Sequence, residues 1–335
     1  MLSYILKRLL WMPVVLVLVV TLVFFLTHMV PGSAVRVLLG PHAGVAQLEK
    51  ATAEYGLDKP LLTQYFLYMG RLLLHGDLGQ SIVTRRTVVR DLSIYLPATL
   101  ELTLFSLILI VVVGVALGVV AAVHRNSVFD IMARGVAVGG VALPQFWLGL
   151  MFILLFSFYL RWFPMGGRLE MTITPPLRVT GMYVFDSLFA GDRKAFWDAL
   201  HHLVLPVLVM ALTNLSTTTS MVRSSMLRTL SEDFTLMAKA YGHRPFRVHY
   251  VYALKNSLIS AVSVIGLTTG YLLGGAVLVE TVFDWPGIGL YAARSILHVD
   301  YAPVVGVALL SAAIYAVVNL ITDLLYAALD PRIRY

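Results

Sequence analysis

The chain has 335 residues, of which 59% are hydrophobic and only 13% are charged, and its mean hydropathy is +0.84. Soluble globular proteins carry about 25% charged residues, so this composition indicates a membrane protein. Cysteine is absent, which excludes a disulfide framework, a thiolate metal site and a cysteine nucleophile. The formal charge of +7 would suit nucleic-acid binding, but the placement of the basic residues favours membrane topology as its cause.

Six intervals contain no Asp, Glu, Lys or Arg over more than twenty residues: 9–35, 102–124, 135–160, 199–222, 256–279 and 301–322. About 20 apolar residues cross the hydrocarbon core as a helix, so we predict six membrane spans with both chain ends on one side. The first interval is longer than the apolar core of a signal peptide, and no cleavage site follows it. We therefore expect a retained anchor.

Lysine and arginine set the predicted orientation. The segments 1–8, 124–134, 223–257 and 327–335 have roughly twice the density of basic residues of the remaining connecting segments. The positive-inside rule therefore places these four segments, and both termini, in the cytoplasm.

The longest polar segment is 31–97, where we expect short helices and turns on the outer membrane surface. It opens with Pro31-Gly32, continues with GLDKPLLTQY, and contains an amphipathic run from Leu61 to Leu74. HGDLGQS and LPATLEL follow. A second external segment, 161–201, has Trp162 and Trp197 near its two ends, as expected of an aromatic belt at the membrane interface.

Glycines recur at a spacing of four in three predicted spans: Gly114 and Gly118 in the second, Gly135 and Gly139 in the third, and Gly266, Gly270 and Gly274 in the fifth. This spacing lets helix backbones approach closely. It is compatible both with packing inside this chain and with packing against a second membrane subunit. Pro144 is expected to kink the third span.

The segment 223–257, between the fourth and fifth predicted spans, differs from an ordinary connector. Ser231 can cap a helix start, and the two acidic residues after it then lie in the first turn. Gly242 suits a helix stop, and Pro245 can begin a second helix. We predict a short helix of about ten residues, roughly 15 Å long, on which a partner outside the membrane can act. The alternative is a basic, solvated loop.

The sequence contains no motif for catalysis. A phosphate-binding loop ends in Gly-Lys-Ser/Thr, and no glycine here is followed by lysine, so ATP hydrolysis would occur on another polypeptide. The His-Glu-x-x-His pattern of zinc proteases is absent. His201 and His202 form the only histidine pair, and no third ligand is near in sequence, so we expect no metal site.

Three polar residues at or within predicted spans are Glu101, Asn319 and Asp323. Ionisable groups inside spans are functional candidates by default, and a proton-coupled carrier would use such groups. Both carboxylates, however, lie near span ends, and Asn319 and Asp323 share one helix face. We favour helix–helix hydrogen bonding or anchoring over a proton relay.

Several stretches resemble the permeases of ABC importers for dipeptides, oligopeptides and nickel. Ala238-Lys239-Ala240-Tyr241-Gly242 is similar to the family's EAA loop, and the following YALKNS is similar to its HALRNA stretch. ETVFDWPGIG, DYAPV and the closing VNLITDLLY…DPRIR are similar to the family's ExxFxWPGxG, DYPV and VNLLVDLLY…DPRIR. The three external motifs also occur in this family in this order. The resemblance covers nearly the whole chain, although Leu236, Met237 and Tyr241 occupy positions that are more often basic.

This resemblance implies an all-α polytopic membrane protein with six transmembrane helices, the type I ABC importer permease fold, and a short-helical external segment. The implied divisions are 1–93 (first span and external segment), 94–327 (five-helix permease domain with the coupling loop 223–257) and 328–335 (cytoplasmic tail). A coupling helix would dock into a groove on a cytoplasmic ATPase. Its implied contact residues are Glu232, Asp233, Leu236, Met237, Ala238, Lys239, Ala240, Tyr241 and Gly242.

The family's external turn corresponds to Phe283, Trp285, Pro286, Gly287 and Gly289. This turn is a candidate gate at the mouth of the transport pathway. A plain tight turn between the fifth and sixth spans is the alternative.

The implied assembly comprises this chain, a homologous second permease, two cytoplasmic ABC ATPase subunits or domains, and an external solute-binding protein in a bacterial inner membrane. ATP and magnesium would bind the ATPases, so no cofactor, no enzymatic activity and no nucleic-acid partner is expected for this chain. Small peptides are the expected cargo. Import of glutathione or of a nickel or other metal chelate is the alternative within the family, and an ion-coupled secondary transporter is the alternative outside it.

Overall fold

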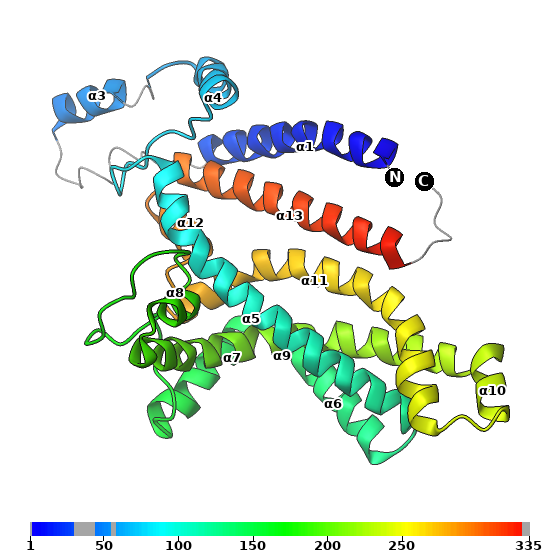
Figure 1. Ribbon diagram of the computed structural model, residues 1–335. Coiled ribbons are helices and arrows are strands. Elements are labelled where there is room, and N and C mark those ends of the chain that lie inside the picture. Colours follow the sequence, from blue (N-terminus) through cyan, green and yellow to red (C-terminus); the bar gives the residue numbers. More distant parts are fainter. Residues whose placement is uncertain (1, 30–43, 55–57, 330–335) are drawn as a thin grey trace.

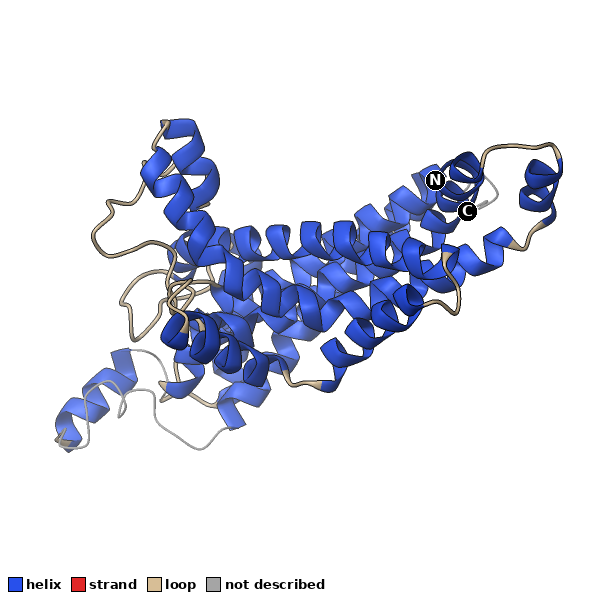
Figure 2. Ribbon diagram, turned by 90° about the horizontal axis from the view of Figure 1, so that it is seen from below, coloured by secondary structure: helices blue, strands red, loops and turns tan. Residues whose placement is uncertain are grey.

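The computed structural model describes residues 2–29, 44–54 and 58–329, in which every regular element is a helix (Figures 1 and 2). In chain order the α-helices are α1 (Leu2–Met29), α3 (Val45–Glu54), α4 (Leu61–His75), α5 (Val88–Val123), α6 (Val128–Ala142), α7 (Gln145–Phe152), α8 (Tyr183–Ala190), α9 (Arg193–Leu230), α10 (Asp233–Ala240), α11 (Leu254–Val282), α12 (Ile288–Leu297) and α13 (Tyr301–Leu329). Two π-helical segments, Ile153–Tyr159 and Arg247–Ala253, extend α7 and lead into α11. Three parts of the sequence predictions lie outside the described residues: Pro31-Gly32, the start of GLDKPLLTQY, and the end of the C-terminal tail.

Four of these helices, α1, α5, α9 and α13, are long and apolar enough to cross a membrane. Two bent pairs qualify as well if each is counted as one span, which gives up to six. One pair is α6 with α7 and its π-helical extension, bent by 102°, and the other is the two halves of α11, bent by 43°. The protein is therefore an all-α, polytopic membrane protein.

The third span departs from the prediction. Its first helix begins at Val128, well before the predicted start of the span, and the chain breaks at Pro144 into two helices at a steep angle. Proline disfavours the helical conformation in the residue before it, and Leu143 accordingly has an extended backbone (φ −103°, ψ 132°). The expected kink at Pro144 is thus a full break.

The stretch LPATLEL is also placed differently from the prediction. It was expected among the short external elements but lies inside α5, with Pro97 buried in the helix. The implied division between residues 93 and 94 therefore falls within one continuous helix.

The amphipathic run after Pro60 forms the predicted short helix, α4, which ends at Gly76 in the left-handed conformation (φ 63°). Trp162 and Trp197 are both exposed, 59% and 67%.

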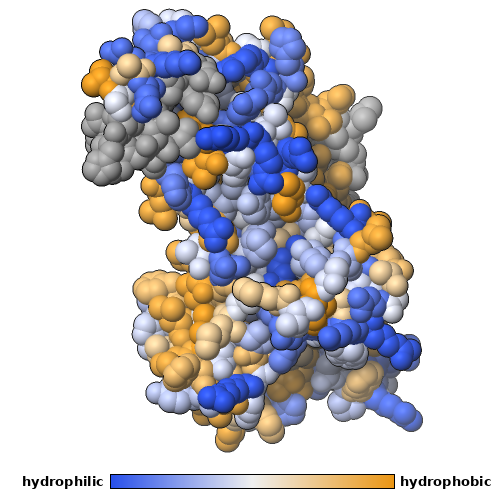
Figure 3. Space-filling model, turned by 90° about the vertical axis from the view of Figure 1, so that its left-hand side faces the viewer, coloured by the Kyte–Doolittle hydropathy of each residue, from blue (hydrophilic) through white to orange (hydrophobic). Residues whose placement is uncertain are grey.

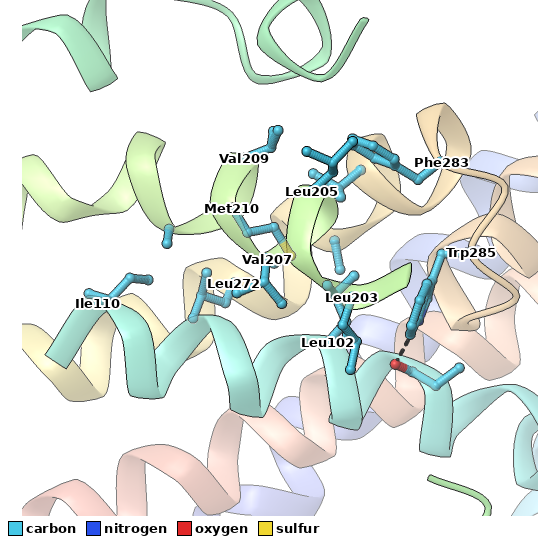
Figure 4. Close-up of a cluster of buried hydrophobic side chains, with 14 of the residues drawn as sticks. Leu102, Ile110, Leu203, Leu205, Val207, Val209, Met210, Leu272, Phe283 and Trp285 are labelled. Carbon is cyan, nitrogen blue, oxygen red and sulfur yellow. Dashed lines mark hydrogen bonds between the residues drawn. The ribbon is translucent and has the colours of Figure 1, made fainter. Parts of the chain in front are cut away.

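The centre of the bundle is built by α5 and α9, which cross closely (Figure 1). Glycines permit the approach: a Cβ on Gly118 would lie only 2.7 Å from Cβ of Val222, and one on Gly114 would lie 3.0 Å from Thr218. Beside this crossing, α5 and α9 form the main apolar core with α11 and the turn that follows it (Figure 4). The core includes Leu102, Ile110, Leu203, Leu205, Met210, Leu272, Phe283 and Trp285.

A buried ion pair fastens the loop 161–182 to α5. Arg168 Nη2 lies 2.6 Å from Glu101 Oε2 and also donates to the Gly181 carbonyl at 2.9 Å. The other oxygen of Glu101 accepts a hydrogen bond from the Val184 N–H at 2.8 Å. At the opposite end of the bundle, Asp323 on α13 pairs with Arg8 on α1. Both carboxylates therefore anchor elements to one another, which is the interpretation that the sequence favoured.

Asp186, on α8, organises the neighbouring turn. Burial acts to raise the pKa of Asp186, but the N–H and hydroxyl of Thr180 and the N–H of Gly181 donate to its carboxylate and lower the pKa below its ordinary value of 3.8. The folded protein therefore binds a proton at this site less readily than the unfolded chain. The stabilisation is complete above the ordinary pKa and is lost as the pH falls through the lowered value.

We expect Asp186→Asn to lower the melting temperature most at neutral pH, because the charged acceptor contributes about 1.5–3 kcal/mol. The difference from the unmodified protein should shrink as the pH falls below about 4. Melting curves of the purified protein between pH 3 and pH 7 measure this difference. A difference that does not change with pH would contradict the role of the charge.

Candidate functional site

The short helix α10 lies at one end of the bundle, outside the packed core (Figure 1). The beginning of α1 and the end of α13 lie at this same end, whereas α3, α4, α8 and α12 lie at the other (Figure 1). The predicted helix between the fourth and fifth spans is therefore present, with eight residues in place of about ten. Pro245 begins the next helical segment, as predicted.

The cap of α10 differs from the prediction. The residue at the N-cap position is Glu232, with an extended backbone (φ −75°, ψ 151°) and no side-chain cap. Ser231 instead ends α9, where its hydroxyl donates to the Arg228 carbonyl at 2.7 Å. Because α9 runs on to Leu230, Ser231 is not available to begin the next helix.

The end of α10 is a Schellman turn built on Gly242. The N–H of His243 donates to the carbonyl of Ala238 at 3.1 Å, and the N–H of Gly242 donates to that of Lys239 at 3.0 Å. Gly242 has φ +78°, a left-handed conformation that costs other residues about 1–2 kcal/mol. This glycine therefore fixes the direction in which the chain returns to the membrane.

One face of α10 packs against α9, and the other face is exposed in this chain. Thr235 is fully buried, and its hydroxyl donates to the Thr229 carbonyl at 2.7 Å. Four exposed apolar side chains lie on or directly after this helix beside the exposed, charged Asp233 and Lys239, and we call the four the α10 apolar face: Phe234, Leu236, Met237 and Tyr241, which are 39–78% exposed. Exposed apolar groups gathered on a helix outside the core make this surface a candidate for binding a partner.

The part of α9 that leads to α10 is packed against the neighbouring helices. A core cluster joins α5, α9 and α11 here and includes Val119, Val222, Met226 and Ala253. Arg223 on α9 forms two hydrogen bonds of 2.7 and 2.8 Å with the carboxylate of Asp130 on α6. These contacts connect the end of α9 that precedes α10 with α5, α6 and α11.

This ion pair was not predicted from the sequence. Ser127 could have indicated the start of a helix at this point, because its hydroxyl accepts from the Asp130 N–H and caps α6. That spacing would have placed Asp130 in the first turn of a helix, and not in a loop.

The external turn is a packed structure. Phe283 and Trp285 are each 1% exposed, and the Trp285 indole donates to the Ala98 carbonyl at 2.9 Å (Figure 4). A Cβ on Gly287 would lie 2.2 Å from Oε1 of the buried Glu280. This turn is therefore joined to α5 and lacks the freedom of an isolated flap, and its role as a gate stays a prediction.

The predicted packing glycines fall into two groups. Gly266 and Gly270 face α13, where a Cβ would lie 2.3 Å from atoms of Thr322 and Tyr315. Gly135, Gly139 and Gly274 have no atom within 4 Å of an added Cβ, so they face away from the packed part of the chain.

The histidine pair takes part in local hydrogen bonds. His201 Nε2 lies 2.6 Å from the Trp162 carbonyl, and His202 Nδ1 lies 2.9 Å from the Asp198 carbonyl. Among residues 2–29, 44–54 and 58–329, no group of three or more His, Asp or Glu is placed to hold a metal ion.

Comparison with known proteins finds one family. Residues 114–335 match the binding-protein-dependent transport system inner membrane component, and residues 1–103 match the N-terminal part of such membrane components. A probable D,D-dipeptide transport system permease of Escherichia coli K12 is 44% identical, over 94% of this chain and 92% of the relative. A dipeptide transport system permease of Alkalihalophilus pseudofirmus is 39% identical, and a glutathione transport system permease of Escherichia coli O6:H1 is 35% identical, both over the full length of both chains.

Proposed function

Because the chain belongs to the family of binding-protein-dependent transport system inner membrane components, we propose that it is a permease subunit of an ATP-driven importer of small peptides. Relatives named as dipeptide permeases are 39–44% identical to it over nearly its whole length. The relative named for glutathione is 35% identical. Peptides are therefore favoured as the cargo over glutathione or a nickel chelate.

The observation that carries this proposal is the α10 apolar face, held outside the core by Thr235 and Gly242. We assign this face to a groove on a cytoplasmic ATPase. ATP and magnesium would bind there and not on this chain. The end of the bundle with α10, the beginning of α1 and the end of α13 would then face the cytoplasm of a bacterial cell, in agreement with its basic segments.

The proposed complex has two ATPase subunits, a second homologous permease in the bilayer, and an external solute-binding protein. The outward-facing Gly135 and Gly139 of α6 offer a surface for the second permease. Closure of the ATPases would pull α10, and the Asp130–Arg223 pair would pass the displacement to α6. The cavity between the two permeases would then open to the opposite side.

A substitution within the α10 apolar face tests this proposal. We expect Met237→Glu to release the ATPase subunits during purification and to reduce uptake at least about tenfold, because a charge would replace an apolar contact at a small interface. Co-purification and dipeptide uptake in cells are the measurements. Phe189→Glu is the matched control, since Phe189 is similarly exposed (64%, against 56% for Met237) but lies on α8 at the other end. Retention of the ATPases and of full uptake by Met237→Glu would contradict the assignment.

A further inference from the structure

Helix α4 has two flanks of opposite character. Three exposed apolar residues at spacings of four and seven share one side of the helix, and we call them the apolar flank of α4: Leu62, Phe66 and Leu73, which are 62–69% exposed. Three polar residues, each two positions from a member of this flank and so about 200° around the helix, form the polar flank: Gln64, Arg71 and His75. An amphipathic helix of this kind suits a boundary between water and hydrocarbon.

The side of α4 between the two flanks packs against the bundle. Tyr68 and Met69 are buried in a cluster with Val20 and Phe24 of α1 and Val305 of α13. Figure 1 shows α4 nearly end-on, whereas α1 and α13 are seen from the side, so α4 lies crosswise to these two helices. Because α4 is crosswise and packs with this side, its two flanks point in opposite directions along the bundle.

Two contacts with α1 show which flank points outward. The Tyr65 hydroxyl lies 2.8 Å from that of Thr21, and the Gln64 side chain is hydrogen-bonded to the imidazole of His28. His28 follows Thr21 by roughly 10 Å along α1, toward the end of the bundle opposite α10. Figure 3 looks onto this end and shows hydrophilic side chains over its upper part, where α3 and α4 lie. The polar flank therefore faces the end of the bundle, and the apolar flank faces back along the spans.

The position of α4 along α1 gives its depth. The rings of Phe24 and Phe25 lie 5.5 and 5.3 Å from that of Tyr65, measured between centroids. These two residues precede the end of α1 by roughly 6–8 Å. No Asp, Glu, Lys or Arg occurs in α1 after Arg8, so this part of α1 belongs to the membrane span. Interfacial amphipathic helices bury their apolar face about 5–10 Å into the boundary of headgroups and acyl chains, which is the depth found here.

The polar flank suits the level of the lipid headgroups. Arg71 and His75 are exposed, and no hydrogen bond or ion pair joins the Arg71 guanidinium to another described residue. The nearby Asp77 carboxylate accepts from the Gly79 N–H at 2.9 Å and forms no ion pair with Arg71 in the described chain. The guanidinium is therefore available to a lipid phosphate, an anion that arginine binds well.

We propose that α4 is inserted in the bilayer interface at the end of the bundle opposite α10, with its apolar flank among the acyl chains and its polar flank among the phosphates. Lipid, and not a partner protein, covers the apolar flank, because this flank faces the space beside the spans that acyl chains fill. Leu67 and Leu74, on the side turned away from the bundle, are exposed to the same lipid. Inserted in this way, α4 holds α1 against α13 through Tyr68 and Met69.

The expected position of the segment 31–97 on the outer membrane surface thereby becomes specific to one helix, one flank and one depth. The anchoring is independent of the proposed transport function, because it involves neither α10 nor the cargo.

Spin labels on α4 test the insertion. The chain has no cysteine, so one introduced cysteine gives one labelling site on it. The whole transporter is labelled in phosphatidylcholine nanodiscs, and the spectrum of the unmodified transporter, treated in the same way, is subtracted. Electron paramagnetic resonance then measures collisions of the label with oxygen, which concentrates in hydrocarbon, and with chromium oxalate, which stays in water. Lipids labelled at known acyl-chain positions calibrate the depth.

The ratio of oxygen to chromium oxalate collisions should alternate between the flanks. We expect it to be at least about fivefold higher for Leu62→Cys, Phe66→Cys and Leu73→Cys than for the controls, because the apolar flank lies about 5–10 Å into the boundary. The matched controls are Arg71→Cys and His75→Cys, which are exposed on the same helix but lie on the polar flank.

Three results would overturn the proposal. A ratio at Phe66→Cys as low as at His75→Cys would place the apolar flank in water. Low collision rates with both reagents at Phe66→Cys would place it against a protein, either a second permease or an external partner. Ratios that do not alternate between the flanks would show that α4 is not a helix lying in the interface. None of these results bears on whether α10 binds an ATPase.

Discussion

Gly242→Val is expected to reduce ATP-driven dipeptide uptake roughly 5- to 30-fold while the protein still inserts in the membrane. The reason is backbone strain, since an added Cβ would meet nothing within 4 Å. The left-handed conformation at φ +78° costs a residue with a side chain about 1–2 kcal/mol, and this energy shifts a conformational equilibrium by about that factor. The Schellman turn would open, and the α10 apolar face would turn away from its groove. Uptake in cells, ATPase activity and the amount of protein in membranes are the three measurements.

Gly191→Val is the matched control for this substitution. Gly191 ends α8 with φ +69° and also has open space around it, so the local strain is similar. It lies at the other end of the bundle from α10 (Figure 1). The control should retain most uptake. Equal loss in both variants would indicate a general folding defect, and normal uptake in Gly242→Val would remove α10 from the coupling route.

Features set by local composition were predictable from the sequence. Each of the six apolar intervals falls on one of the four long apolar helices or on one of the two bent pairs, and the pairing of Gly242 with Pro245 located the end of α10 and the start of the next helical segment. Glycine and proline act on the backbone of their own and adjacent residues, so their effects need no knowledge of distant contacts. The family motifs added the fold class and the function.

Features that depend on neighbouring elements were not predictable. Ser231 is a suitable N-cap for α10, but in the structure it is the C-cap of α9. The sequence alone does not show to which of the two helices this residue belongs. Pro144 indicated a kink, but the sequence did not indicate that the axis of α7 turns by 102° from that of α6. That angle depends on how α7 packs against α9 and α11. The sequence suggested that Glu101 anchors elements, but its partner Arg168 is 67 residues away and no spacing rule joins them.

A cavity of about 740 Å³ at the end of the bundle opposite α10 illustrates the same limit. Its lining combines residues of α1, α4 and α13, from Phe24 to Val305. In the sequence, the DYAPV stretch stands out as a family signature, and Tyr68 lies within an amphipathic run. Only the fold shows that Asp300 and Tyr68 line one space, and that each has a polar atom without a partner in the described chain.

Arg168→Met is expected to destabilise the purified protein by about 3–5 kcal/mol, because it leaves the carboxylate of Glu101 buried without its cation. Glu101 is fully buried and Arg168 nearly so, and water cannot take over the pairing. The guanidinium also lies 3.6 Å from the ring centroid of Tyr183, so the substitution removes a cation–π contact as well. The free energy of unfolding, followed by tryptophan fluorescence during denaturation in mixed micelles, measures the loss.

Two further variants show whether charge or packing is responsible. Arg294→Met breaks an ion pair of similar length with Asp284, but both side chains are more than half exposed, so the loss should stay below about 1 kcal/mol. Adding Glu101→Gln to Arg168→Met removes the orphaned charge while keeping an acceptor for the Val184 N–H. If the buried charge is the cause, the double variant should regain stability relative to Arg168→Met, since the cost of a broken buried pair falls mainly on the charge left behind. A double variant no more stable than Arg168→Met would assign the loss to the packing of the guanidinium against Tyr183 and Trp285.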